Sequence, residues 1–336
     1  MRAEIIGYFG AGELCDDLLL HMIRETFDSI CDDIEWHPRD KEIVDLLIMG
    51  GGSLLGGPHV FGNPHIKKSL EKSSCVFCIF GTGFRETNLK LFSRAGLEKM
   101  KYMWNRADMI AVRGKTSVER VDQLGFDVSK ISALGDPVFL LEGKKAEKEY
   151  IGGVIRPQPY NLNHELMKQR LAFLKSEIQQ EVRLFSLCDH QGDLIGKELG
   201  FRTQSLLENY SRKAVIRGYP SFQQIMEESC AAVYRSYFWL GNRLHPFCVA
   251  LINSVPTIGV EIEFRKVEDV CSTLNYPYWI RADAPIEEFK EMYYQLTNKW
   301  EKVNEGVQKK ITEIKKDLWE IAQRTVDIVQ AAHGGA

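Results

Sequence analysis

The sequence of 336 residues lacks an apolar run long enough to cross a bilayer and lacks an apolar leader at its start. We therefore expect neither a signal peptide nor stable insertion in a membrane. An excess of charge is missing as well, since 43 Lys and Arg stand against 46 Asp and Glu, for a net charge of -3. The two signs are interleaved, which excludes a broad basic face for nucleic acid. The expected protein is cytoplasmic and binds no nucleic acid.

The sequence also lacks a second closely spaced cysteine pair. Its eight cysteines are scattered through apolar segments, which is typical of reduced, buried thiols. Cys75 and Cys78 have the spacing of a redox or zinc motif, but they lie in an apolar segment that predicts a buried strand. Residues three apart on a strand point to opposite faces, so we expect core packing for this pair. No cluster of His, Cys and carboxylates has metal spacing, and we expect no required metal or cofactor.

Apolar segments alternate with helical patterns along the chain, and the length indicates about two domains. This alternation favours doubly wound parallel sheets, so we predict an α/β protein with two Rossmann-like domains facing a cleft. The predicted parts are an N-terminal domain at 1–142, a charged linker at 143–149, a C-terminal domain at 150–283 and C-terminal helices at 284–332. In the last part an apolar stripe recurs at helical spacing from residue 286 to residue 321, and Gly306 is expected to divide it into two helices.

Glycine-rich turns follow the predicted strands of the first domain. The strands are expected at 4–8, 44–49, 75–80 and 108–113. The first three lead into turns that begin at Gly10, Gly50 and Gly81, which would line one edge of a parallel sheet. The first turn partly matches a dinucleotide fingerprint, with Glu35 as the acid for the ribose and Cys15 in place of the third Gly or Ala. A tight turn that needs positive φ is the alternative.

Arg113 ends the fourth predicted strand, at the same edge as the glycine-rich turns. The sequence Gly114-Lys115-Thr116 follows it, but Met109 stands where a phosphate-binding P-loop needs glycine, so we reject a P-loop. Two interpretations of Arg113 remain open, an anion-binding residue and a structural arginine paired with an acid.

A strand-to-helix turn in the predicted second domain carries two candidate site residues. Its strands are predicted at 150–155, 182–187, 214–216 and 256–260, and an apolar run at 233–240 is predicted to be a strand and its exit. Arg243 and His245 follow that run at the start of an apolar helix, where Pro246 is tolerated in the first turn. A guanidinium and an imidazole at a helix N-terminus are typical of an anion site. The alternative is a surface arginine and a histidine satisfied in the core.

Several segments, taken in order, resemble the polysaccharide pyruvyl transferase family, of the exopolysaccharide and capsule type, over about residues 5 to 275. They are 7–10 with Asp16 and Asp17, then 47–55, 80–83, 107–113, 135–141, 243–245 and 255–260. The resemblance implies a fold similar to the two-domain GT-B glycosyltransferases. It also implies transfer of a pyruvyl group from phosphoenolpyruvate to a sugar of a polysaccharide or its precursor, forming a cyclic ketal.

The sequence departs from this family's pattern in two places. Glu13 and Cys15 stand where the family tends to have Asn and Gly, which affects the expected contacts with the acceptor. At 261–266, Glu-Ile-Glu-Phe-Arg-Lys replaces a usual Tyr-Asp-Pro-Lys and leaves Lys266 as the matched residue. The second departure indicates a changed acceptor or a weakened donor site.

The resemblance also implies roles for individual residues. Arg113, Arg243 and His245 are expected to hold the donor or carry out its chemistry. Histidine can move protons near neutral pH, so His245 is the expected general acid and base, while the arginines would offset charge on the departing phosphate. Further contacts with donor or acceptor are expected from Gly10, Asp16, Asp17, Gly51, Gly52, Ser53, Gly81, Thr82, Gly83, Arg156 and Lys266.

The expected partners are phosphoenolpyruvate and a sugar or lipid-linked oligosaccharide acceptor, and the sequence leaves a homo-oligomer open. One alternative enzyme is a GT-B glycosyltransferase that uses a nucleotide-sugar. The two departures keep a non-catalytic paralogue in consideration. An NAD enzyme has weaker support, because the second domain offers nothing for hydride chemistry.

Overall fold

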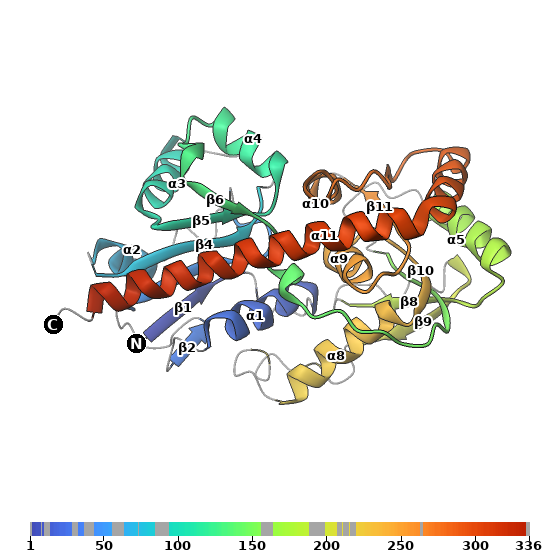
Figure 1. Ribbon diagram of the computed structural model, residues 1–336, viewed down its shortest axis with the longest axis horizontal. Coiled ribbons are helices and arrows are strands. Elements are labelled where there is room, and N and C mark those ends of the chain that lie inside the picture. The colour runs from blue at the N-terminus through green and yellow to red at the C-terminus, as the bar shows by residue number, and fades with distance from the viewer. Residues whose placement is uncertain are drawn as a thin grey trace. The chain divides into compact units, whose positions relative to one another are not determined.

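The computed structural model places most of the chain in two compact units (Figure 1). The described residues are 2–7, 9, 14–28, 33–36, 44–55, 64–72, 74–84, 94–155, 164–187, 199–206, 210, 215, 220–262 and 265–333. Unit 1 comprises Met1–Phe9, Leu19–Leu140 and Glu313–Ala336, and unit 2 comprises Gly10–Leu18 and Leu141–Thr312. The observed units differ from the predicted domains at the start of the first helix and in the C-terminal helical segment.

Unit 1 is built on a six-stranded parallel sheet with the strand order β2-β1-β3-β4-β5-β6. The strands are β1 (Arg2–Ile6), β2 (Asp33–Trp36), β3 (Leu46–Gly50), β4 (Val76–Thr82), β5 (Met109–Val112) and β6 (Ile131–Leu134). Every residue of β3 and β4 is buried, because the central strands of a parallel sheet are covered on both faces. The predicted strands are confirmed as β1, β3, β4 and β5, whereas β2 and β6 were not predicted.

Helices connect these strands, as the alternating sequence pattern predicts. They are α1 (Leu14–Phe27), α2 (Pro64–Glu71), α3 (Arg94–Arg106) and α4 (Lys115–Gln123), with short 3₁₀ segments at Val128–Lys130 and Pro137–Leu140. Cys75 and Cys78 are buried and free, so the prediction of core packing is confirmed. Burial raises the pKa of Cys75 to about 11 and that of Cys78 to about 12, which keeps both thiols neutral.

Unit 2 contains a second six-stranded parallel sheet, with the order β12-β11-β10-β7-β8-β9. The strands are β7 (Tyr150–Val154), β8 (Val182–Ser186), β9 (Arg202–Ser205), β10 (Ser236–Gly241), β11 (Thr257–Glu261) and β12 (Trp279–Arg281). The helices are α5 (His164–Ile178), α8 (Pro220–Tyr234), α9 (Leu244–Ile252) and α10 (Lys266–Leu274). The prediction of two Rossmann-like parallel sheets is therefore confirmed.

Two strand predictions in unit 2 need correction. The run at 233–240 does not begin as a strand, because α8 continues through Tyr234 and β10 starts at Ser236. A short apolar run does not distinguish a buried helix end from a strand. The strand predicted at 214–216 falls mainly outside the described residues, and Val215 within it is helical.

The predicted linker at 143–149 belongs to unit 2 and packs on it. The Lys144 backbone N–H donates to Asn253 Oδ1 at 2.6 Å, and the Lys144 ammonium pairs with Glu227 at 2.5 Å. Further along, Lys148 Nζ donates to the Tyr234 carbonyl at 2.8 Å. These contacts fix the segment between β6 and β7 to the ends of α8 and α9.

A single helix, α11 (Ile286–His333), replaces the two C-terminal helices that were predicted. Gly306 does not interrupt it, and a Cβ atom at this position would meet nothing within 4 Å. A glycine in a helix costs about 1 kcal/mol, which the buried stripe on both sides of it exceeds. The stripe includes Phe289 and Leu296 in unit 2, and Leu318 and Val329 in unit 1. Each unit thus takes part of its core from this helix.

Unit 1 shows this packing directly. A Cβ atom at Gly135 would lie 2.5 Å from Ile314 Cγ2, so the helix approaches the chain closely where β6 ends. The Thr325 hydroxyl also lies 3.6 Å from the sulfur of Cys78 in β4. Among the described residues, we find no helix with both the length and the apolar character that a bilayer crossing requires.

Candidate functional site

Glycine-rich turns leave the carboxyl ends of β3 and β4 in unit 1. Gly51, Gly52 and Gly81 have φ angles of 77°, 60° and 67°, a region in which glycine avoids the steric cost of a side chain. The Gly83 N–H donates to the Gly52 carbonyl at 3.1 Å, which joins the two turns. The predicted glycine positions 51, 52, 81 and 83 therefore lie together at one edge of the sheet.

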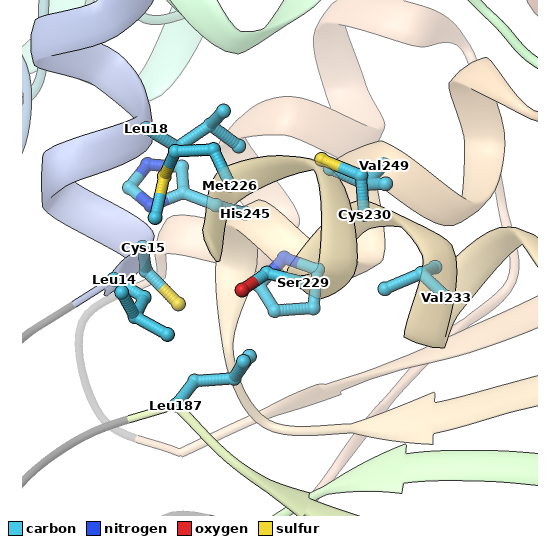
Figure 2. Close-up of a pocket in the computed structure, with 11 residues that line it drawn as sticks. Leu14, Cys15, Leu18, Leu187, Met226, Ser229, Cys230, Val233, His245 and Val249 are labelled. Carbon is cyan, nitrogen blue, oxygen red and sulfur yellow. The ribbon is translucent and has the colours of Figure 1, made fainter. Parts of the chain in front are cut away.

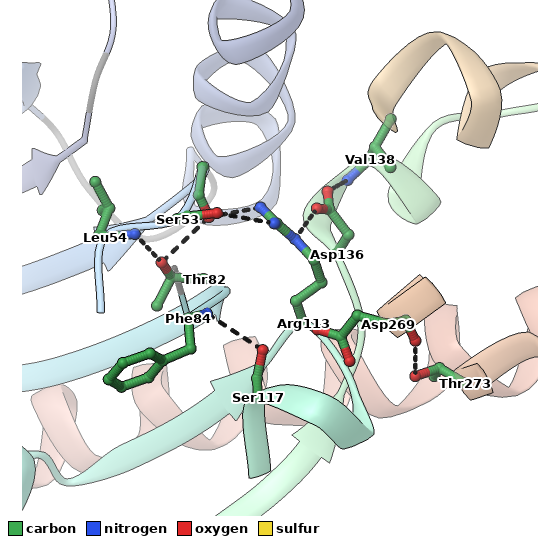
Figure 3. A network of polar contacts seen from close by, with 11 residues as sticks. Ser53, Leu54, Thr82, Phe84, Arg113, Ser117, Asp136, Val138, Asp269 and Thr273 are labelled. Carbon is green, nitrogen blue, oxygen red and sulfur yellow. Dashed lines mark hydrogen bonds and ion pairs between the residues drawn. The ribbon is translucent and has the colours of Figure 1, made fainter. Parts of the chain in front are cut away.

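Arg113 lies directly after β5 and reaches across these turns (Figure 3). Its side chain is 2% exposed, and its Nε donates to Asp136 Oδ2 at 2.9 Å. The other two nitrogens donate to Ser53 Oγ at 3.2 Å and to the Gly52 carbonyl at 2.5 Å. A Cβ atom at Gly83 would lie 2.9 Å from Arg113 Nη1, so glycine leaves the space for the guanidinium.

Asp136 and Thr82 complete this network. The Asp136 carboxylate is fully buried, and its second oxygen accepts from the Val138 N–H at 3.1 Å. The Thr82 hydroxyl accepts from the Leu54 N–H at 3.0 Å and donates to the Gly52 carbonyl at 3.3 Å. Hydrogen bonds thereby connect the carboxyl ends of β3, β4, β5 and β6.

These contacts confirm one of the two interpretations that the sequence left open for Arg113, that of a structural arginine paired with an acid. The arginine is paired with an acid, as the structural interpretation predicted, and three of its five N–H donors are directed at protein acceptors. Its expected role in binding the donor stays a prediction. Asp136 was part of a matched segment but had no predicted role, because a partner 23 residues away leaves no local signal.

The turn between β10 and α9 in unit 2 carries Arg243 and His245. Arg243 is the N-cap of α9, with extended backbone angles of −105° and 128°, and His245 lies in the first helical turn. Both side chains are buried, with exposed fractions of 8% and 6%. The alternative of a surface arginine is therefore wrong. Burial of both groups at a helix N-terminus, where the helix dipole favours negative charge, suits an anion.

A small cavity of about 20 Å³ lies beside His245 (Figure 2). Its lining comes from the first turns of α1, from α8 and α9, and from Leu187. Figure 2 shows the imidazole of His245 close to the side chains of Leu18 and Met226. Most of the lining is apolar, and the cavity has room for about one water molecule or one methyl group.

The first turns of α1 are fixed to unit 2. The Leu14 N–H donates to the Leu187 carbonyl at 3.1 Å. Asp17 is fully buried, and its carboxylate accepts from the Tyr210 hydroxyl at 2.8 Å, whereas Asp16 is half-buried. Asp17 thus has a structural partner in Tyr210, and its expected contact with donor or acceptor stays a prediction. Tyr210 was not predicted, since it lies 193 residues away in a polar stretch.

Lys266 is the first residue of α10, and Glu261 ends the strand before it. The Glu261 carboxylate accepts from the backbone N–H groups of Val267 at 2.7 Å and Glu268 at 3.2 Å. Burial raises the pKa of Glu261, and these N–H groups together with Lys266 offset part of the rise. From the end of β11, Glu261 therefore accepts hydrogen bonds from two N–H groups in the first turn of α10, whose N-cap residue is Arg265.

Two predicted site residues, Gly10 and Arg156, lie outside the described residues, as does most of the dinucleotide-like turn. The side chain of Glu35 is likewise not described. Across the part of the chain that the structure describes, no three His, Cys, Asp or Glu residues are placed to hold a metal ion.

Comparison with known proteins decides the family. The model of the polysaccharide pyruvyl transferase family matches residues 16–263. The chain belongs to the polysaccharide pyruvyl transferase family. The match covers the strands from β2 to β11, which belong to both sheets, and includes Arg113, Arg243 and His245. No curated protein matches the sequence.

Solved structures share the fold at low sequence identity. The UDP-GlcNAc 2-epimerase of Methanocaldococcus jannaschii, in complex with UDP-GlcNAc and UDP, is similar with a TM-score of 0.54 and 10% identity, over 89% of this chain and 93% of that chain. A putative UDP-N-acetylglucosamine 2-epimerase from Listeria monocytogenes gives 0.53 and 10%, over 92% and 90%. A functionally uncharacterised protein from Klebsiella pneumoniae gives 0.51 and 12%, over 84% and 93%. These likenesses show a GT-B-like fold and nothing about substrates.

The structure shows where two residues of the departures from the family pattern lie. Cys15 lines the His245 cavity, where the family tends to have glycine, and Glu13 lies outside the described residues. Glu261 opens the second departure and accepts hydrogen bonds from the first turn of the helix on which Lys266 lies. Both departures therefore fall in unit 2, beside residues that the family pattern matches.

Proposed function

We propose that this protein transfers a pyruvyl group from phosphoenolpyruvate to two hydroxyl groups of a sugar, in a polysaccharide or its precursor, and forms a cyclic ketal. The observation that carries the proposal is the buried pair of Arg243 and His245 at the N-terminus of α9, within a family match over residues 16–263. We propose no metal or cofactor for the reaction.

The chemistry forms two C–O bonds at one carbon, first by an addition and then by a substitution. In the first, a sugar hydroxyl oxygen bonds to C2 of phosphoenolpyruvate, its proton leaves, and C3 gains a proton and becomes a methyl group. In the second, a neighbouring hydroxyl oxygen bonds to C2 and loses its proton. The bond from C2 to the phosphate oxygen breaks, and inorganic phosphate leaves with the electron pair. The products are the ketal and phosphate.

His245 is the proposed acid that protonates C3, because imidazole exchanges protons near neutral pH. Arg243, two residues before it, would hold the phosphate or carboxylate of the donor at the N-terminus of α9. Its guanidinium fork suits both planar and tetrahedral anions, and its charge would stabilise the departing phosphate. Lys266 at the start of α10 is a further proposed anion contact in unit 2.

Arg113 has two proposed functions. Its contacts with Asp136, Ser53 and Gly52 support a positioning role, in which it holds the glycine-rich turns of unit 1 in shape. The remaining N–H groups of the Arg113 guanidinium could also bind an anion, as the family pattern implies. The glycine-rich turns would then present backbone N–H groups to the donor or the acceptor.

The test is calorimetric titration with phosphoenolpyruvate, alone and together with a panel of sugars that carry free 4,6- or 3,4-hydroxyl pairs. Wild-type protein should bind the donor, and Arg243→Ala should lose binding while keeping its thermal unfolding midpoint. Arg235→Ala is the matched control, because Arg235 is half exposed and pairs with Glu149 at 2.5 Å in the same unit.

Turnover gives a second readout. With donor labelled at C3, the vinyl carbon resonance should be replaced by that of a ketal methyl group, with release of one phosphate per ketal. Binding of a uridine nucleotide without binding of phosphoenolpyruvate would instead favour a nucleotide-sugar glycosyltransferase. Binding of neither, in a folded protein, would favour a non-catalytic paralogue.

A further inference from the structure

The cavity beside His245 has no role in the steps of the proposed reaction. We infer that it is the subsite for the reacting C3 carbon of the donor, taking the methylene group of phosphoenolpyruvate and then the methyl group of the ketal. This inference rests on the proposed function and adds to it a determinant of donor specificity.

The size of the cavity fits this group. Its volume of about 20 Å³ has room for a group the size of a water molecule or a methyl group. The wall is shaped by side chains such as Leu14, Leu18 and Val249, which have no polar atoms. Transfer of a methyl group from water into such surroundings is favourable.

The charge of the lining fits as well. Among the described residues that line the cavity, none is an Asp, Glu, Lys or Arg. Burial raises the pKa of the Cys230 thiol to about 12, so this group is neutral at physiological pH. The phosphate and the carboxylate of the donor would stay outside the cavity, towards Arg243 and the N-terminus of α9.

His245 is the lining residue that can carry out the proton transfer. The carbon that gains a proton must lie against the acid that supplies it, and a group in this cavity lies against the imidazole. Val249 follows His245 by one helical turn and borders the same space (Figure 2). Val249 and Cys15 therefore determine how large a group on C3 the site accepts.

The experiment compares two donors that differ by one methyl group on C3, phosphoenolpyruvate and (Z)-phosphoenol-2-oxobutyrate. Calorimetry, with the sugar panel present, gives the ratio of their dissociation constants for each protein. Wild type should prefer phosphoenolpyruvate by about tenfold or more, since one misplaced methyl group in a pocket costs about 10- to 200-fold. Val249→Ala should lower this ratio about tenfold, whereas Val249→Ile should weaken phosphoenolpyruvate itself about tenfold.

Val329→Ala is the matched control. Val329 is a fully buried helical valine in unit 1, outside the cavity, so its truncation should leave the ratio unchanged at a similar cost in stability. Val249→Ile adds a methyl group to the cavity, and substitutions that fill a cavity commonly stabilise, so it should fold at least as stably as wild type. It keeps the test decisive even if Val249→Ala does not fold.

The outcomes separate the two proposals. If wild type binds phosphoenolpyruvate but Val249→Ala leaves the ratio unchanged, or Val249→Ile leaves the dissociation constant of phosphoenolpyruvate unchanged, the cavity holds water or remains empty, and the subsite assignment is wrong. If wild type binds neither donor with any sugar of the panel, the proposed function fails and the subsite fails with it.

Discussion

Each unit places an arginine after a strand of its parallel sheet, at the edge formed by the carboxyl ends, and the two arginines differ in their surroundings. Arg113 in unit 1 is held by Asp136, Ser53 and the Gly52 carbonyl, so its charge is largely used within the protein. Arg243 in unit 2 caps a helix next to His245 and an apolar cavity. Two arginines that each follow a strand of a parallel sheet can therefore have different roles, because fold position alone does not set a role.

Replacing His245 should have the largest effect, because it removes the proton donor proposed for unit 2. His245→Ala should lower the rate of ketal formation about 10²- to 10⁴-fold, the range for loss of a general acid or base. The measurement is phosphate release with phosphoenolpyruvate and an acceptor sugar. His21→Ala is the control, since His21 forms a helix-surface pair with Glu25 in unit 1. Turnover near the wild-type rate in a folded His245→Ala protein would show that His245 is not the acid that protonates C3.

Replacing Asp136 tests whether Arg113 in unit 1 is held by its carboxylate partner. Asp136→Ala leaves the buried Arg113 without its carboxylate, and removal of one partner from a buried pair costs about 3–5 kcal/mol. Urea unfolding should report this loss, and the double variant Arg113→Met with Asp136→Leu should recover much of it. Asp283→Ala, in an exposed pair with Arg281, should change stability little. A small effect of Asp136→Ala would mean that Arg113 is freer to bind a ligand than its contacts indicate.

The smallest expected effect concerns Glu261, whose carboxylate accepts hydrogen bonds from the first turn of α10 and is not paired with an arginine as Asp136 is. Because burial raises its pKa in the folded state, the folded protein binds the proton more tightly than the unfolded chain does. The stability due to this group is complete below the unfolded pKa and is lost as the pH rises through the raised folded pKa. Glu261→Gln, which keeps an oxygen for these hydrogen bonds, should remove this part of the pH dependence.

Unfolding of wild type and Glu261→Gln across mildly acidic pH would measure that difference. The wild-type curve should fall relative to the variant curve as the pH rises through this window. Parallel curves would show that the three backbone N–H groups on the carboxylate, from Ile262, Val267 and Glu268, balance the effect of burial. Glu181→Gln is the control, because Glu181 lies at the surface and has a lowered pKa owing to Arg183.

The local sequence predicted the sheets well where strands are apolar and central. β3, β4 and β7 are buried along their whole length, so each is a continuous apolar run that ends in a turn. β9 alternates between half-buried and exposed residues and β12 has three residues, so neither gives such a run. The turn with Arg243 and His245 was predicted because Pro246 and the apolar helix define it locally.

Long-range pairings could not be predicted in the same way. Arg113 with Asp136 and Asp17 with Tyr210 join residues that are 23 and 193 positions apart. Local periodicity does not specify such partners, which depend on how the strands and helices are brought together in the fold. The uninterrupted course of α11 through Gly306 also depends on packing over its whole length.

The division of α11 between the units has a consequence for biosynthesis. Domains generally fold in order as the chain leaves the ribosome. Unit 1 contains the first strands of the chain, yet Leu318 and Val329 of its core come from α11, after all of unit 2 has been synthesised. The sheet of unit 1 must therefore wait, incompletely covered, until more than 310 residues have emerged. During that interval the apolar strands of unit 1 stay partly exposed, and we expect chaperones to bind them.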